Sequence, residues 1–127
     1  MRNAINWFEI PARDFDRAVT FYDTIFGVTL HRGEFMGVPH GFFSMDEEGV
    51  SGAIIAHKVV PGGTEIPGET GALLYLNADG QIDAILGRVE SAGGKVIQPK
   101  ADIAPQGFIA IFLDTEGNKV GLHQSSM

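Results

Sequence analysis

The sequence contains no cysteine, which excludes a disulfide framework and a thiol nucleophile. It contains no apolar run long enough to cross a bilayer, and its first residues lack the apolar core of a signal peptide. Lysine and arginine number only nine against sixteen acidic residues, which gives a formal charge of −7. Phosphate backbones and anionic membranes repel such a surface. We therefore expect a cytoplasmic protein that binds neither nucleic acid nor membrane.

The sequence does contain enough apolar material for a core, and a pattern that occurs twice. Of its 127 residues, 44% are hydrophobic and 20% charged, as in globular proteins, and the length suits one domain over residues 1–127. The stretch "PHGFFSM" (39–45) returns as "PQGFIAI" (105–111), 66 residues later. The same offset, kept without gaps, pairs His57 with His123. Two copies fit the length, so the repeat predicts a pair of modules and not a longer array.

Each copy has the same order of predicted elements. In the first copy, a strand at 6–10 is followed by a helix at 14–27 with apolar residues at helical spacing, and three more strands follow. The segment 58–70 is rich in glycine and proline and is predicted to be a linker. The sequence therefore predicts an α+β fold of two tandem βαβββ modules, at 1–57 and 71–124, with mixed sheets.

The inner strands of each module are predicted from short apolar runs. In the first module these runs are 28–31 and 41–45, separated by a loop with the sequence "RGEFMGVP" (32–39). The helix of the second module is predicted across 82–93. Glycine, proline and charged residues between the runs indicate turns.

The strands are predicted to have two different faces. Side chains alternate along a strand, so one face of the sheet packs against the helix and the other points away from it. On the first and last strands this second face presents six candidate ligand-binding residues: Trp7, Glu9, His57, Tyr75, Asn77 and His123. If both modules curl these faces toward one axis, they form a mixed concave pocket for a small organic molecule; otherwise the faces are exposed to solvent. His40 is predicted to be a solvated turn residue, with a place at the rim of the pocket as the alternative.

Two longer stretches carry a family resemblance. The sequences "FEIPARDFDRAVTFYDTIFG" (8–27) and "FLDTEGNKVGLH" (112–123) resemble the glyoxalase/bleomycin-resistance/extradiol-dioxygenase superfamily, also called vicinal oxygen chelate proteins. The resemblance spans essentially the whole chain. It implies that each module curls into a half-cup, that two half-cups enclose a cavity for a small molecule, and that the protein forms a homodimer.

The resemblance also implies a divalent metal held by His, Gln or Glu at four positions on the first and last strands. Carried onto this chain, these positions are Trp7, Ile55, Leu73 and Gly121. None of these residues has a metal-binding side chain. We therefore expect no metal cofactor, and the metal-dependent chemistry of the family loses its Lewis acid.

Three functions are consistent with these residues. The first is a metal-free protein that binds or sequesters a small metabolite or drug. The second is a glyoxalase-like lyase or isomerase, in which the catalytic candidates Glu9, His57 and His123 either hold a displaced metal or perform metal-free acid–base chemistry. The third is a dimeric scaffold whose cups are filled by side chains. Similarity of fold cannot choose between them.

Overall fold

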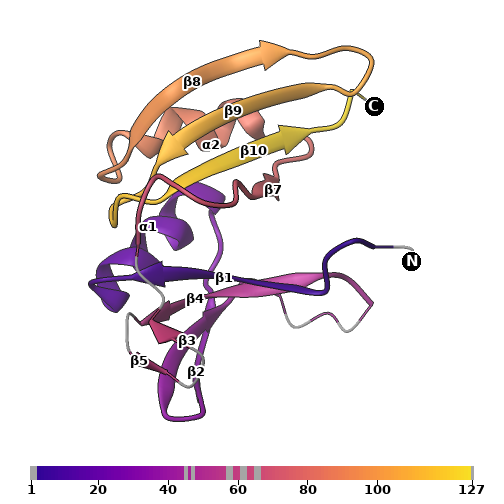
Figure 1. Cartoon of the computed structure of the whole chain (residues 1–127). Coiled ribbons are helices and arrows are strands. Elements are labelled where there is room, and N and C mark those ends of the chain that lie inside the picture. Colours follow the sequence, from indigo (N-terminus) through magenta and orange to yellow (C-terminus); the bar gives the residue numbers. More distant parts are fainter. Residues whose placement is uncertain are drawn as a thin grey trace.

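The computed structural model describes residues 3–44, 46, 48–56, 59–60, 63–64 and 67–126. These residues form two four-stranded sheets, two helices and one short hairpin (Figure 1). The first module contains β1 (Trp7–Ala12), α1 (Phe15–Phe26), β2 (His31–Phe35), β3 (Val38–Phe42) and β4 (Ser51–Ala56). The second module contains β7 (Tyr75–Asn77), α2 (Ile82–Val89), β8 (Lys95–Asp102), β9 (Phe108–Leu113) and β10 (Lys119–Gln124).

The two sheets have the same strand order, which confirms the α+β fold of tandem βαβββ modules. The order is β1-β4-β3-β2 in the first sheet and β7-β10-β9-β8 in the second. In each sheet the first and last strands of the module pair in parallel, and the other neighbours are antiparallel. The segment between the modules contains β5 (Val59–Val60) and β6 (Gly63–Thr64), which pair antiparallel. The two sheets do not close on each other.

The inner strands of the first module differ from the prediction. β2 and β3 form a hairpin across the segment where the sequence predicts a loop, and only Met36 and Gly37 separate them. Both residues have positive φ, 54° and 77°, and such a pair makes the tight turn that suits two twisted strands. The second helix is shorter than predicted, because α2 ends at Val89 and turns follow it.

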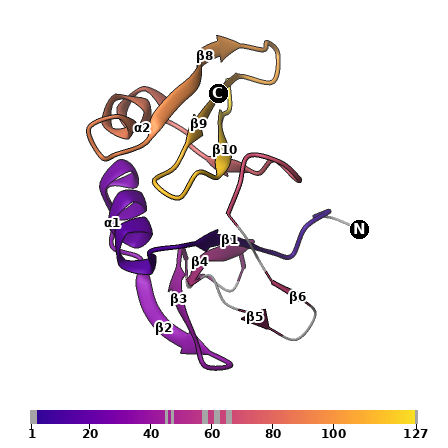
Figure 2. The same ribbon diagram turned by 60° about the vertical axis from the view of Figure 1, so that its left-hand side comes forward.

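The helices pack together and bury one face against the sheets. Asp14 caps α1 by accepting the backbone N–H of Arg17 at 3.0 Å, and α1 ends before Gly27, which has φ +66°. Helix α1 contacts α2, and Figure 2 shows the two helices one above the other at the left. The largest buried side chains of the core include Phe21, Tyr22, Ile54, Ile85, Phe112 and Leu122. Among the described residues, no helix is long and apolar enough to span a membrane.

The strands alternate as the sequence predicts. On β1, Ile10 is buried in the core, whereas Trp7 is 43% exposed. On β10, Val120 and Leu122 are buried in the core, and His123, which follows them, is only partly buried. Each sheet therefore has a core face and a second face that points away from the helices.

The repeat is shifted in the last strands. The parallel pairing places Pro11 opposite Ile55 in the first module and Asn77 opposite His123 in the second. Because the 66-residue offset matches Pro11 with Asn77, the counterpart of His123 is Ile55. One offset of 66 therefore does not fit both strand pairs; His57 itself lies outside the described residues, so its equivalence with His123 stays a prediction. β8 and β9 also pair with register irregularities, between Val96 and Gln98 and between Gln98 and Ala101.

Candidate functional site

Two predicted site residues, Trp7 and Glu9, lie together on β1. The indole Nε1–H of Trp7 donates a hydrogen bond to Oε2 of Glu9 at 3.3 Å. The indole is 43% exposed, and the Glu9 side chain is 31% exposed. An exposed ring beside an oriented carboxylate can bind a ligand by stacking and by charge-assisted hydrogen bonds. His57, predicted to share this face, lies outside the described residues.

His40 is buried in β3, so its prediction as a solvated turn residue is wrong. The residue is 5% exposed, and its Nδ1 lies 2.8 Å from the carbonyl oxygen of Val38. A carbonyl only accepts, so Nδ1 carries the proton. Its Nε2 lies 3.7 Å from Oε2 of Glu9, and its ring stacks on Phe42 with centroids 5.4 Å apart. Strand alternation could have found this position, because His40 is two residues from both Val38 and Phe42.

These side chains form what we call the first-module face, defined by Trp7, Glu9, His40 and Phe42. The rings of Trp7 and Phe42 lie 6.1 Å apart and tilted by 54°. Both rings line a hollow of about 270 Å³ that also contains Asp46. The face is therefore rich in aromatic surface and acidic in charge.

The other candidates lie on the second sheet. Tyr75 on β7 and His123 on β10 line an apolar hollow of about 440 Å³ together with Ile103, Gln106 and Ile109. The Nε2–H of His123 donates to the carbonyl oxygen of Gln106 at 2.8 Å. We call this surface the second-module face. Its candidates and those of the first-module face line separate hollows.

Asn77 has a different environment from the other candidates. Its Oδ1 accepts the backbone N–H of Asp79 at 2.9 Å, which stabilises the turn before α2. It lines a hollow of about 220 Å³ between the modules, next to Phe8 and Phe26. This placement gives Asn77 a structural contact that the sequence does not predict.

The four positions that the family resemblance implies for a metal have no side chain that can bind one. Gly121 lies opposite Tyr75, and a Cβ on Gly121 would be 2.5 Å from Cδ1 of Tyr75, so the phenol ring takes the space of the absent side chain. Trp7, Ile55 and Leu73 likewise have no metal-binding atom. Within the described part of the chain, no three His, Asp or Glu residues come close enough to hold a metal ion. The displaced site of Glu9, His57 and His123 includes a residue outside that part and stays a prediction.

A buried polar cluster attaches the turn at 114–118 to the first module. The hydroxyl of Tyr22 donates to Oδ2 of Asp114 at 2.8 Å, and Nδ2 of Asn118 donates to the same oxygen at 3.1 Å. Burial raises the pKa of the Asp114 carboxyl. Burial and the neighbouring Asp114 carboxylate raise the pKa of Tyr22 well above its ordinary value. These groups are closed to solvent, so the sequence "DTEGN" (114–118) has a structural role here.

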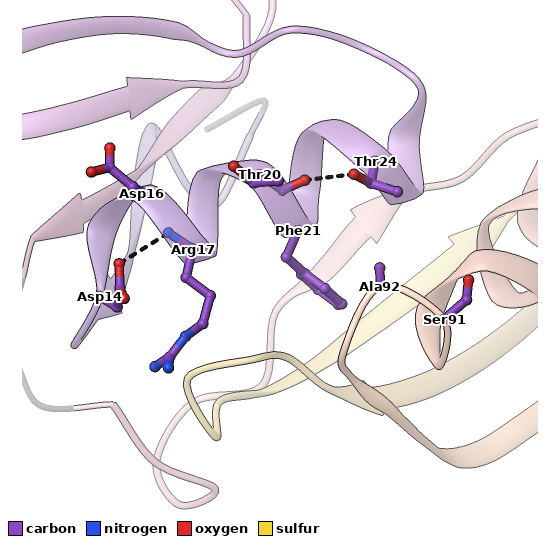
Figure 3. Close-up of a pocket in the computed structure, with 8 residues that line it drawn as sticks. All are labelled: Asp14, Asp16, Arg17, Thr20, Phe21, Thr24, Ser91 and Ala92. Carbon is purple, nitrogen blue, oxygen red and sulfur yellow. Dashed lines mark hydrogen bonds between the residues drawn. The ribbon is translucent and has the colours of Figure 1, made fainter.

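A hollow of about 600 Å³ lies beside α1, away from all the candidates (Figure 3). Figure 3 shows Arg17 extending from the first turn of α1, with Thr20 and Thr24 farther along the helix. The guanidinium of Arg17 is already paired with Glu116 at 2.8 Å. The hollow therefore offers a ligand no unengaged cation, and we assign it no functional role.

Comparison with known proteins identifies relatives of this fold. The sequence matches the model of the Glyoxalase/Bleomycin resistance protein/Dioxygenase superfamily over residues 4–122. A glyoxalase/bleomycin resistance protein from Albidiferax ferrireducens is 19% identical, with a TM-score of 0.68 over 96% of this chain and 99% of that chain. The antibiotic binding protein TnmS3 from a Streptomyces species is 26% identical, with a TM-score of 0.64 over 98% and 97%. The fosfomycin resistance protein FosX from Listeria monocytogenes is 15% identical, with a TM-score of 0.67 over 100% and 97%.

No curated protein matches the sequence significantly. The family model nevertheless covers most of the chain, and the solved structures share its fold over nearly their whole length. The duplicated strand order leads to the same assignment. This chain belongs to the Glyoxalase/Bleomycin resistance protein/Dioxygenase superfamily.

Proposed function

We propose that this protein binds and sequesters a small organic molecule, and that it does so without the usual metal site of its family. The observation that carries the proposal is the first-module face, where the exposed indole of Trp7 lies beside the oriented carboxylate of Glu9. TnmS3, which shares 26% identity with this chain, is an antibiotic binding protein. That likeness supports a binding function over an unrelated use of the fold.

The two faces supply complementary contacts for such a molecule. Stacking on Trp7 would contribute ~1–3 kcal/mol when the ring is covered, and each charge-assisted hydrogen bond to Glu9 roughly 1.5–3 kcal/mol. On the second-module face, Tyr75 and His123 would contact the ligand beside the apolar side chains of Ile103 and Ile109. A ligand that reaches both faces would gain from both sets of contacts.

The test uses the single tryptophan of the chain. Trp7 fluorescence should change when a binding metabolite or drug is titrated into the wild-type protein. The variant Trp7→Ala, measured by calorimetry, should bind the same molecule roughly 10- to 100-fold more weakly because stacking is lost. Ile97→Ala removes a side chain of similar exposure, 44%, from β8 and should leave binding unchanged.

Two results would contradict the proposal. If no molecule of a broad metabolite and drug collection binds at millimolar concentration, the protein is not a small-molecule binder. If a molecule binds but Trp7→Ala and wild type bind it equally, the first-module face is not the site.

A lyase or isomerase is the second candidate, because His40 gives Glu9 a described partner for proton transfer at 3.7 Å. Turnover of a bound molecule, lost in Glu9→Gln, would establish this activity. Binding with no chemical change to the molecule would leave sequestration as the function.

We also propose that the protein is a homodimer, as the family resemblance implies. Val28, Met36 and Leu73 are 49%, 76% and 37% exposed in one chain, and a second copy could cover apolar side chains of this kind. The mass of one chain is 13.6 kDa, and light scattering at micromolar concentration should give twice that mass. A mass equal to one chain would contradict this proposal.

A further inference from the structure

Glu9 and His40 form a corner that accepts hydrogen bonds. The Nδ1–H of His40 is engaged by the carbonyl oxygen of Val38 at 2.8 Å, so in the neutral ring the lone pair of Nε2 faces Glu9 at 3.7 Å. Two hydrogen-bond acceptors that face each other cannot form a hydrogen bond unless a donor lies between them. Trp7 supplies one donor to Glu9 from the side. The Glu9 side chain is 31% exposed and that of His40 only 6%, so a ligand N–H reaches the corner from the Glu9 side.

The charge around this corner favours a cation. Among the described residues, the ion-pair partner of Glu9 within 4 Å is His40. Lys119 lines a cavity that Glu9 also lines, but its amine makes no ion pair with Glu9 at that distance. Asp46 adds a second carboxylate beside Trp7 and Phe42. An anionic ligand would meet repulsion here, whereas an ammonium group would meet two acceptors and a negative field.

The shape of the face favours a flat apolar body. The exposed ring of Trp7 and the ring of Phe42 lie 6.1 Å apart, and the imidazole of His40 stacks on Phe42. Aromatic faces attract apolar planes by stacking and cations by their quadrupole. A ligand with its ammonium group at Glu9 would therefore lay its planar part over Trp7.

We propose that the first-module face binds the protonated amine of a primary or secondary amine with a flat apolar body. This inference rests on the proposed binding function and names the chemical class of its ligand. Glu9 and Nε2 of His40 accept the ammonium N–H groups, and Trp7 and Phe42 contact the planar part. His40 is thus a binding residue that comes beside Glu9 only in the folded sheet.

The test compares three probes that share one ring system. They are 1-naphthylmethylammonium, its N,N,N-trimethyl derivative and neutral 1-naphthylmethanol. The readout is the NMR signal of the Trp7 indole N–H, which is the single tryptophan signal of the chain and donates to Glu9. The primary ammonium should shift this signal saturably and bind at least tenfold more tightly than the alcohol. The trimethyl derivative should bind more weakly than the primary ammonium, because it has charge but no N–H donor.

Substitutions distinguish binding at the Glu9–His40 corner from a general effect of negative charge on the protein. Glu9→Gln should weaken binding of the primary ammonium about tenfold or more and leave the alcohol unaffected. Glu34→Gln removes the same charge from the same sheet, at an exposed position in β2 that alternation places on the opposite face, and should change neither probe. His40→Leu should weaken the ammonium probe several-fold, with its unfolding midpoint measured to verify that the variant is folded.

Three outcomes would overturn the inference. If the alcohol binds as tightly as the ammonium, the aromatic face binds the ring and the amine corner is wrong, while the proposed binding function stands. If the NMR chemical shifts of the imidazole nitrogens show that neutral His40 carries its proton on Nε2, the corner lacks its second acceptor. If no probe shifts the Trp7 signal, the face does not bind flat amines, and the broader ligand screen decides the proposed function separately.

Discussion

Gly121 illustrates how a missing side chain shapes the second-module face. The family resemblance implies a metal-ligand position here, and a Cβ on Gly121 would lie 2.5 Å from the ring of Tyr75. Any larger residue at 121 would push the phenol away from β10. The Tyr75 ring thus packs over Gly121, and this face offers a ligand aromatic and apolar surface.

At the same scale, Glu116 provides a testable contact between the modules. It accepts hydrogen bonds from Arg17 Nε at 2.8 Å and from the backbone N–H of Asp14 at 2.8 Å. Burial acts to raise its pKa, but these hydrogen bonds outweigh burial and lower the pKa to about 2. We expect Glu116→Gln to lower the free energy of unfolding by about 2 kcal/mol at neutral pH, a value kept small because Arg17 is half-exposed to water.

The direction of the pKa shift predicts how the stabilisation by Glu116 changes with pH. The folded pKa of Glu116 is below its ordinary value of 4.5, so its contribution is complete above pH 4.5 and is lost as the pH falls toward 2. Urea unfolding of wild type and Glu116→Gln should therefore converge across that interval. Glu34→Gln, an exposed control, should follow the wild type. A difference between wild type and Glu116→Gln that stays constant down to pH 2 would contradict the assignment.

At the scale of elements, the two helices contain glycines with opposite roles. Gly27 ends α1 in the left-handed region, at φ +66°, and a Cβ there would lie 3.1 Å from a guanidinium nitrogen of Arg88. Gly87 lies inside α2, where a Cβ would have no neighbour within 4 Å. We expect Gly27→Ala to lower the free energy of unfolding by about 1 kcal/mol and Gly87→Ala to raise it by roughly 0.5–1 kcal/mol.

Thermal unfolding of the two variants provides the measurement. Each adds the same methyl group, so the pair separates backbone conformation from side-chain chemistry. If both midpoints move in the same direction, the left-handed backbone conformation at the end of α1 is not the reason that position 27 requires glycine.

At the scale of the whole molecule, the modules are joined through their helices and through the 114–118 turn. Besides the Tyr22 and Glu116 contacts, Nδ2 of Asn118 donates to the carbonyl oxygen of Pro11 at 2.8 Å, which attaches the turn to β1. These contacts fix one module against the other, while the sheets stay unclosed. The open faces are why we place ligand binding there.

The sequence by itself determined the features that depend on neighbours along the chain. Helical spacing predicted α1 within a residue at its ends, and strand alternation placed Trp7 and Glu9 on one face with Ile10 in the core. The repeat predicted two modules of the same order. These features follow from periods of 3.6 and 2 residues, which local sequence contains.

Only the tertiary structure decided which distant residues meet. Glu9 and His40 lie on β1 and β3, which β4 separates: Ala53 pairs with Glu9 on one side, and Ile55 pairs with His40 on the other. The different registers of the two parallel pairs, with Pro11 opposite Ile55 and Asn77 opposite His123, are likewise visible only in the folded sheets. Strand order and register are set by the summed pairing and packing of a whole sheet, so no local pattern in the sequence could reveal them.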